Sequence, residues 1–219
     1  MIDWKRVLVL SPHPEDGELG CGGAIQRLMS EGAECWYAAF TVAEKSTHPP
    51  FPPDAQRAEM GKSTRIIGYR SDRVLVRNWE VRGFHADRQE ILDYMLELRE
   101  EIKPDLVFCH CRDDIHQDHQ TVMAEAIRAF KRCSILGYEL PWNTFRFSAD
   151  FYVELTAQQV AAKCEALSCY ASRSYRPYLS GERLRQWMGM RGLAIETEYA
   201  ECFEVIRFIH RLTPLSGEL

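Results

Sequence analysis

The sequence has no apolar run long enough to cross a membrane and no excess of basic residues. A spanning helix needs about 20 consecutive apolar residues, so we expect no transmembrane segment. The chain carries 27 Lys and Arg against 32 Asp and Glu, which gives a formal net charge of −5. Proteins that bind the phosphate backbone of nucleic acids normally present a basic face, so the charge argues against that class.

Internal repeats, low-complexity tracts and linker-like stretches are also lacking, which predicts a single domain over residues 1–219. The first expected strand starts within about half a dozen residues of Met1, which leaves no room for a targeting segment. We therefore expect the 8 cysteines to be reduced thiols rather than a disulfide framework. A composition of 46% hydrophobic and 27% charged residues is ordinary for a globular protein. These features favour a cytoplasmic domain of enzyme size.

The sequence does have a regular alternation of expected strands and helices. Short apolar runs predict buried strands, and amphipathic stretches predict helices. We expect strands over residues 6–10, 35–42, 73–76, 105–110, 134–139, 151–155 and 198–209. We expect helices over residues 24–31, 55–67, 88–103, 121–130, 157–169 and 181–190. This alternation predicts an α/β fold, a Rossmann-like three-layer sandwich with a mostly parallel central sheet.

The expected fold also predicts where ligand chemistry collects. In the common doubly wound order, the first strand lies beside the fourth, and ligands bind at the carboxyl ends of the strands near that point. Loop residues 13–16 follow the first strand, and residues 113–119 follow the fourth. These are the two stretches richest in histidine and carboxylate, so we expect them to face each other across one crevice.

The first of these stretches, residues 11–23, contains one histidine, three carboxylates and four glycines. Prolines on both sides of His13 fix the backbone and make the loop stiff. His13 and Asp16 can then converge on one metal ion, while Glu15 points into the cavity as a base. The alternative is that both residues only cap the following helix, whose N-terminus attracts carboxylates in any case.

The second stretch contains the sequence His116-Gln117-Asp118-His119 at the expected start of a helix. Residues three positions apart share a helix face, so His116 and His119 can both face the crevice. Asp118 is suited to orient a ring by accepting its N–H. The alternative is a polar helix N-terminus exposed to solvent, although histidine is not a favoured capping residue.

Taken together, His13, Asp16 and His119 supply two imidazoles and one carboxylate from two facing loops. That set, with a fourth position left to water, is the pattern of a catalytic zinc site. Glu15 and His116 then remain for acid–base chemistry.

Two other patterns invite a ligand but have simpler explanations. Cys109-His110-Cys111 ends a buried strand, where free cysteine behaves as a small hydrophobe and alternation places both thiols away from His110. Gly20, Gly22 and Gly23 do not fit the Gly-x-Gly-x-x-Gly spacing of a dinucleotide site. Tight turning and close packing of helix on strand explain these glycines.

At its two main motifs the chain resembles the PIG-L, or LmbE-like, family of zinc-dependent N-deacetylases. Family members have His-Pro-Asp-Asp-Glu followed by glycines, and a His-x-Asp-His group. Here the motifs are residues 13–17, with glycines at 20, 22 and 23, and residues 116–119. The resemblance extends over the whole chain, with weaker matches at Arg57-x-Glu59 and at residues 199–203.

The resemblance implies one zinc ion per chain, held by His13, Asp16 and His119. It implies that Glu15 is the general base. It also implies that His116, held by Asp118, stabilises the oxyanion or protonates the leaving amine. The implied reaction removes an N-acyl group, expected to be acetyl, from a small amino sugar or glycoconjugate. The resemblance further suggests self-association as a homo-oligomer.

The chain departs from the family pattern at two positions. Glu15 is one methylene longer than the usual aspartate, which can misplace the base by about 1 Å and cost ~100-fold in rate. Gly17 replaces the usual glutamate and removes an outer support. Because the base position is altered, a metal-binding sensor or scaffold with little or no hydrolysis is an alternative. A nucleotide-binding Rossmann module is a third hypothesis.

The substrate pocket is expected to be walled by three loops, residues 43–53, 78–86 and 171–180. Three arginines are candidates to bind an anionic group of the substrate, and Arg57 is the one we assign to substrate binding. The alternative for each is an ordinary surface arginine. These arginines are Arg57, Arg173 and Arg176.

Overall fold

The computed structural model describes residues 4–210 of the chain. Its described strands form one sheet of 7 strands in the order β3-β2-β1-β4-β5-β7-β6. Neighbouring strands from β3 to β5 pair in parallel, whereas β7 runs antiparallel to both β5 and β6. The strands are β1 (Arg6–Ser11), β2 (Glu34–Ala39), β3 (Val74–Val76), β4 (Leu106–His110), β5 (Ser134–Tyr138), β6 (Phe151–Leu155) and β7 (Tyr199–Arg207).

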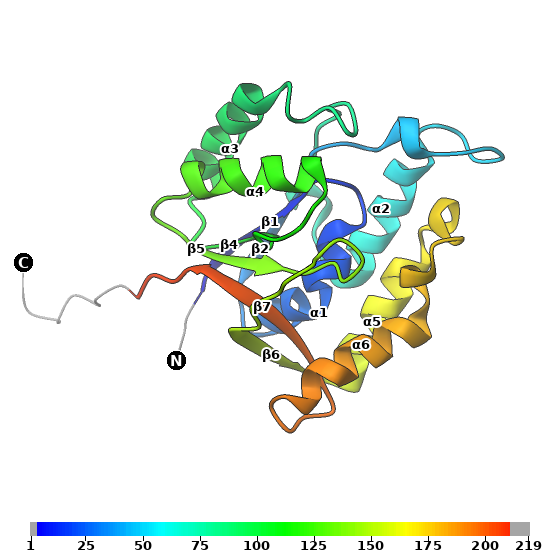
Figure 1. Cartoon of the computed structure of the whole chain (residues 1–219), viewed down its shortest axis with the longest axis vertical. Helices are drawn as coiled ribbons and strands as arrows, with labels where there is room; N and C mark the ends of the chain where they lie inside the picture. The colour runs from blue at the N-terminus through cyan, green and yellow to red at the C-terminus, as the bar shows by residue number, and fades with distance from the viewer. Residues whose placement is uncertain (1–3, 211–219) are drawn as a thin grey trace, which may run out of the picture.

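Helices cover both faces of this sheet. Figure 1 shows α3 and α4 together on one face, and α1, α2, α5 and α6 on the other. The predicted α/β sandwich with a mostly parallel central sheet is therefore confirmed. Among residues 4–210, no helix is both long and apolar enough to span a bilayer. The helices are α1 (Asp16–Ser30), α2 (Ala55–Ile67), α3 (Arg88–Ile102), α4 (Gln117–Ala129), α5 (Ala157–Ser168) and α6 (Gly181–Leu193).

The hydrophobic core of residues 4–210 consists of two clusters, one on each side of the sheet. Successive residues of a strand point to opposite faces, so Val7 and Val9 belong to one cluster while Leu8 and Leu10 belong to the other. All four side chains are fully buried. A strand buried on both faces needs a continuous apolar run, which is why the sequence pattern identified β1 correctly.

Helix α1 starts at Asp16, earlier than residue 24 where the sequence predicted it. The glycines lie inside this helix rather than in a loop. The helix is kinked at Cys21, where φ is −144°. The kink frees two backbone N–H groups, and those of Gly23 and Ala24 donate to the carboxylate of Glu201 at 2.9 and 2.7 Å. The C-terminal strand β7 therefore holds the middle of α1.

Close packing of α1 on the sheet explains the glycines, as predicted. A Cβ atom added at Gly20 would lie 2.2 Å from the ring of Tyr138 on β5, closer than real side chains approach. Helix α4 begins at Gln117, four residues before the expected range of 121–130 but at the motif that was expected to start a helix. As a result, the whole 116–119 motif sits at the first turn of α4, directly beyond the carboxyl end of β4.

Candidate active site

The loop that follows β1 is fixed by its own hydrogen bonds. The Ser11 hydroxyl donates to the carbonyl oxygen of His13 at 2.6 Å and accepts from the backbone N–H of Gly17 at 2.9 Å. The backbone N–H of His13 donates to Oδ2 of Asp16 at 2.8 Å. The carbonyl oxygen of Pro14 accepts two tyrosine hydroxyls, each at 2.6 Å. The loop is therefore rigid without any ligand.

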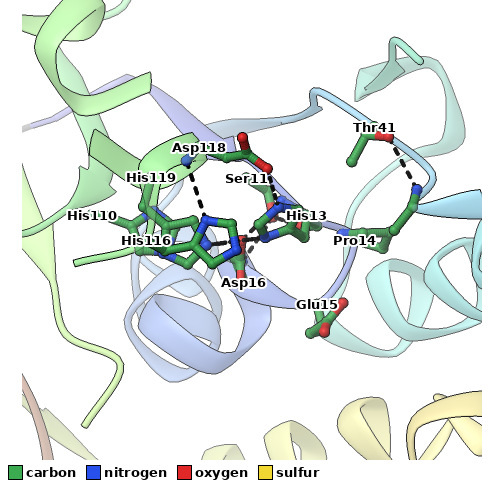
Figure 2. Close-up of polar contacts among 12 residues, drawn as sticks. Ser11, His13, Pro14, Glu15, Asp16, Thr41, His110, His116, Asp118 and His119 are labelled. Carbon is green, nitrogen blue, oxygen red and sulfur yellow. Dashed lines mark hydrogen bonds and ion pairs between the residues drawn. The ribbon is translucent and has the colours of Figure 1, made fainter. Parts of the chain in front are cut away.

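The two sequence motifs meet at one point, as the topology predicts (Figure 2). Nδ1 of His13 lies 3.1 Å from Oδ2 of Asp16 and 3.0 Å from Nε2 of His119. Nε2 of His119 lies 3.3 Å from the same Asp16 oxygen. Bonds of about 2.1 Å in a tetrahedral zinc site place neighbouring ligand atoms about 3.4 Å apart. The three predicted ligands thus form a triangle of the size that one metal ion requires.

The outer ring nitrogens show which way the histidines present their lone pairs. Nε2 of His13 bonds Asp118 at 3.0 Å, and Nδ1 of His119 bonds Asp114 at 2.9 Å. Because a carboxylate only accepts, each outer nitrogen carries a proton, and when the ring is neutral each inner nitrogen turns a lone pair toward Asp16. Three acceptor atoms that face one another in this way need a cation between them, so the residues fit a bound metal ion.

The electrostatics of the site point the same way. Burial alone would lower the pKa of His13, but the charge and hydrogen bonds of Asp16 and Asp118 raise it to about 10. Burial also opposes ionisation of Asp16, yet the two histidines hold its pKa well below the usual range. The triangle therefore attracts positive charge, which either protons or a metal ion can supply.

The two orienting carboxylates differ from the expectation. Asp118, which was expected to hold His116, instead accepts from the His13 ring and from the backbone N–H of Arg82 at 2.6 Å. Asp114 was not singled out from the sequence, although it is 1% exposed and binds His119. An acidic residue shortly before a predicted histidine ligand, in the same polar loop, was the signal available.

His116 is both a helix cap and a cavity residue, so the two alternatives for it are not exclusive. It is the N-cap of α4, and its Nδ1 accepts the backbone N–H of Asp118 at 3.2 Å. The proton of the neutral ring is therefore on Nε2. Burial and the charge of His13 lower the pKa of His116 to about 4. At ordinary pH the ring is a neutral hydrogen-bond donor at the edge of the cavity.

Glu15 lies beside the triangle and is paired with an arginine. Its carboxylate Oε1 is 2.9 Å from Nη2 of Arg173, and the two residues are 3% and 7% exposed. Arg173 comes from a short turn between α5 and α6, and that turn is held by α2. The backbone N–H and hydroxyl of Ser172 donate to the carboxylate of Glu59 at 2.8 and 2.6 Å. Glu59 thus acts as an anchor for Arg173.

The glycine at position 17 has a packing reason. A Cβ atom there would lie 2.6 Å from the ring of Tyr37, so a glutamate side chain does not fit. The expected loss of an outer support is offset by the next residue. Glu18 is buried, and its carboxyl group lies within hydrogen-bond distance of the hydroxyls of Tyr37 and Tyr170, the latter at 2.9 Å. Burial raises the pKa of Glu18 to about 7.

His110 lies directly behind the triangle, which the sequence did not predict. Its ring is fully buried and stacks on that of His119 at 3.6 Å between centroids. Its Nε2 lies 3.8 Å from Oδ2 of Asp16. Within residues 4–210, neither ring nitrogen of His110 has a hydrogen-bond partner. Among those residues, two groups of side chains could hold a metal ion, His13–His116–His119 and Asp16–His110–His119, and neither contains a cysteine.

The cavity in front of the triangle has a volume of about 240 Å³. All three loops that were expected to wall it contribute, through Ser46, Arg82 and Arg173 among others. A segment after β5 also lines it, through Trp142 and Asn143 among others. Arg57 does not line the cavity: it is exposed on α2, because that helix turns its neighbours at 56 and 59 inward. Its assignment to substrate binding has no support from this geometry.

The protein has a doubly wound α/β fold with a buried His–Asp–His cluster at the crevice between β1 and β4. Such a cluster is suited to bind a metal ion. Residues 8–130 match the model of the PIG-L family, described as GlcNAc-PI de-N-acetylase. Because the match covers more than half of the 219 residues, the chain belongs to the PIG-L family.

Individual relatives agree with this membership. The uncharacterized deacetylase YaiS of Escherichia coli K12 is 24% identical over 174 residues, which cover 77% of this chain and 91% of that protein. The conserved protein TT1542 from Thermus thermophilus superimposes with a TM-score of 0.80 at 23% identity, over 97% of this chain and 98% of that one. The N,N'-diacetylchitobiose deacetylase from Pyrococcus horikoshii superimposes with a TM-score of 0.73 at 22% identity, over 93% of this chain and 84% of that one. At these identities the two structures show a common fold.

Proposed function

We propose that this protein is a zinc-dependent N-deacetylase that hydrolyses the acetyl amide of a small amino sugar or glycoconjugate. The observation that carries the proposal is the triangle of His13, Asp16 and His119, whose three acceptor atoms lie 3.0–3.3 Å apart beside a buried carboxylate. Family membership and the named activity of the Pyrococcus relative support the choice of amide and sugar.

The predicted ligands are His13, Asp16 and His119, with one metal ion per chain. When bound, zinc would polarise the amide carbonyl and lower the pKa of water toward ~7. Asp118 and Asp114 accept the outer ring N–H groups and so keep both histidines in the tautomer that binds a metal. Two nitrogens and one oxygen are ligands that zinc commonly takes in catalytic sites.

The remaining residues have roles that follow from their hydrogen bonds. Glu15 accepts the proton of the attacking water, since its Oε2 is buried and without a partner in the described part of the chain. His116 donates its Nε2–H to the carbonyl oxygen as negative charge develops there. A C–O bond forms, the C–N bond breaks, and the proton passes to the departing nitrogen. The products are acetate and a protonated amine.

The direct test combines metal analysis with two variants. Protein purified without chelator should contain about one zinc per chain and release amine from a panel of N-acetylated sugars. His119→Ala should lose both metal and turnover, because one corner of the triangle is removed. Glu15→Gln should keep the metal and lose turnover. Full activity of His119→Ala would refute the ligand assignment.

The same experiment separates the alternative function. A sensor or scaffold would bind about one metal ion per chain but release no amine from any sugar in the panel. The altered base position favours that outcome, whereas the buried pairing of Glu15 with Arg173 favours hydrolysis, because it fixes the longer side chain in one place.

A further inference from the structure

A second hollow opens directly beside the cavity in front of the triangle. We call it the aromatic groove, and its volume is about 550 Å³. Trp142, Arg176 and Tyr178 line both spaces, so the groove continues from the cavity. The rings of Trp142 and Tyr178 stack 3.7 Å apart at an angle of 9° and form the partition between them. The remaining walls are Pro141, Pro177, Arg183, Leu184 and Trp187.

The relative sizes of the two spaces indicate what each can hold. The cavity, at about 240 Å³, is smaller than the roughly 300–1,000 Å³ that pockets for small ligands usually have. It therefore suits one acetylated sugar ring. Any group attached to that ring must leave the cavity, and the groove is the larger space next to it. The groove is thus placed to hold the part of the substrate that does not react.

The walls of the groove are held in place before any ligand arrives. The Trp187 indole donates to the carboxylate of Glu139 at 3.0 Å, and Arg191 donates to the same carboxylate at 2.7 Å. Leu184 is 1% exposed and forms part of the core. Trp142, by contrast, is 38% exposed and presents its ring at the partition. A flat ring can stack on such a surface with little rearrangement.

The groove carries positive charge, which favours a ligand with an anionic group. Arg176 and Arg183 both line it, and neither has an ion-pair partner among residues 4–210. The packing partner of Arg176 within those residues is the ring of Tyr175, 4.9 Å away. No carboxylate lines the groove in the described part of the chain. Arginine presents a planar set of donors that matches a carboxylate or a phosphate.

We propose that the aromatic groove is a subsite for an aglycone, namely a planar aromatic ring that carries a carboxylate or phosphate. The ring would lie against the groove side of the Trp142–Tyr178 partition, and the anion would meet Arg183 and Arg176. This inference rests on the proposed function, since it treats the groove as an extension of the deacetylase cavity. It names the substrate class as an acidic aryl glycoside of an N-acetylated amino sugar.

Binding of the amine products tests the groove without any turnover. The probes are the methyl, phenyl, 4-carboxyphenyl and 4-phosphophenyl glucosaminides, and calorimetry on zinc-loaded wild-type protein gives their dissociation constants. Stacking should make phenyl bind about three- to tenfold tighter than methyl. Either anion should add about fivefold more, as a partly exposed ion pair does. Whichever of the 4-carboxyphenyl and 4-phosphophenyl probes binds more tightly identifies the anion that the arginines prefer.

Two arginines on one helix give a matched pair of variants. Arg183→Gln should remove most of the gain from the anion, because Arg183 lines the groove. Arg185→Gln is the control, since Arg185 is exposed on the same helix, bonds the carbonyl oxygen of Gly181 at 3.3 Å and does not line the groove. Trp142→Leu should reduce the phenyl-to-methyl ratio. Circular dichroism checks that each variant is folded.

Equal binding of all four probes would overturn the inference, and so would equal effects of the two arginine variants. Turnover of the N-acetylated forms separates this inference from the proposed function. Graded binding without any amine release would refute the deacetylase and leave the groove standing. Amine release from all four N-acetylated forms with no gradation in binding would refute the groove and leave the deacetylase standing.

Discussion

The ion pair between Glu15 and Arg173 allows a test of the site that needs no substrate. Replacing Arg173 by Gln leaves the Glu15 carboxylate, which is 3% exposed, without a cation. Removing one partner of a buried pair typically costs about 3–5 kcal/mol of stability. If Glu15 is first changed to Gln, the buried Arg173 is already unpaired, so removing it costs at most a hydrogen bond of about 1 kcal/mol. The expected coupling is therefore at least about 2–4 kcal/mol.

The assay is urea unfolding of the four proteins of this double-mutant cycle, in the presence of chelator and at one fixed pH. A coupling of that size is a large part of the roughly 5–15 kcal/mol by which domains are usually stable, so it is readily measured. The exposed pair of Arg27 and Glu31 is a suitable control, since side chains that are 42% and 52% exposed should couple weakly. A Glu15–Arg173 coupling below about 0.5 kcal/mol would refute the buried pair.

Three further predictions concern the surroundings of the site. Asp114→Asn should weaken zinc binding about 10–100-fold in a chelator competition, because Asp114 accepts the His119 N–H; unchanged affinity would remove its orienting role. Gly20→Ala should cost at least about 1–3 kcal/mol in urea unfolding, whereas Gly61→Ala, with nothing within 4 Å, should be neutral or stabilising. The raised pKa of Glu18, from an ordinary value of 4.5 to about 7, means that the folded state holds a proton which the unfolded state has lost. Metal-free wild type should therefore lose stability relative to Glu18→Gln as the pH rises from 4.5 to 7, and parallel pH profiles would contradict this.

The sequence predicted the parts of this molecule that depend on local patterns. The apolar run at Val7–Leu10 identified β1, and the winding rule for α/β sheets then placed the loops that carry His13 and His119 against each other. The start of α1 was wrong because glycine disfavours helix on its own, while here close packing on Tyr138 requires it. In that case tertiary packing decided the structure and propensity did not.

Local sequence patterns could not predict side-chain contacts between residues that are far apart in the chain. Arg173 pairs with Glu15 across 158 positions of the chain, and nothing in the local sequence of either residue indicates the other. The family resemblance implied that Asp118 holds His116, but its carboxylate turns to His13 across the crevice. Arg57 was expected to bind substrate, but it lies on the exposed face of α2 and does not line the cavity.

Two parts of the chain form the cavity: one carries the proposed metal ligands, and the other forms the walls of the aromatic groove. Every residue of the triangle, and Glu15 beside it, lies within residues 8–130, the range that matches the family. The partner of Glu15, the stacked partition and the whole aromatic groove come from residues after 130. Mutation in the later part is therefore expected to remodel what the protein recognises while the proposed metal ligands stay in place. A chimera that joins residues 1–130 to the second half of a relative should keep its metal and acquire a different substrate.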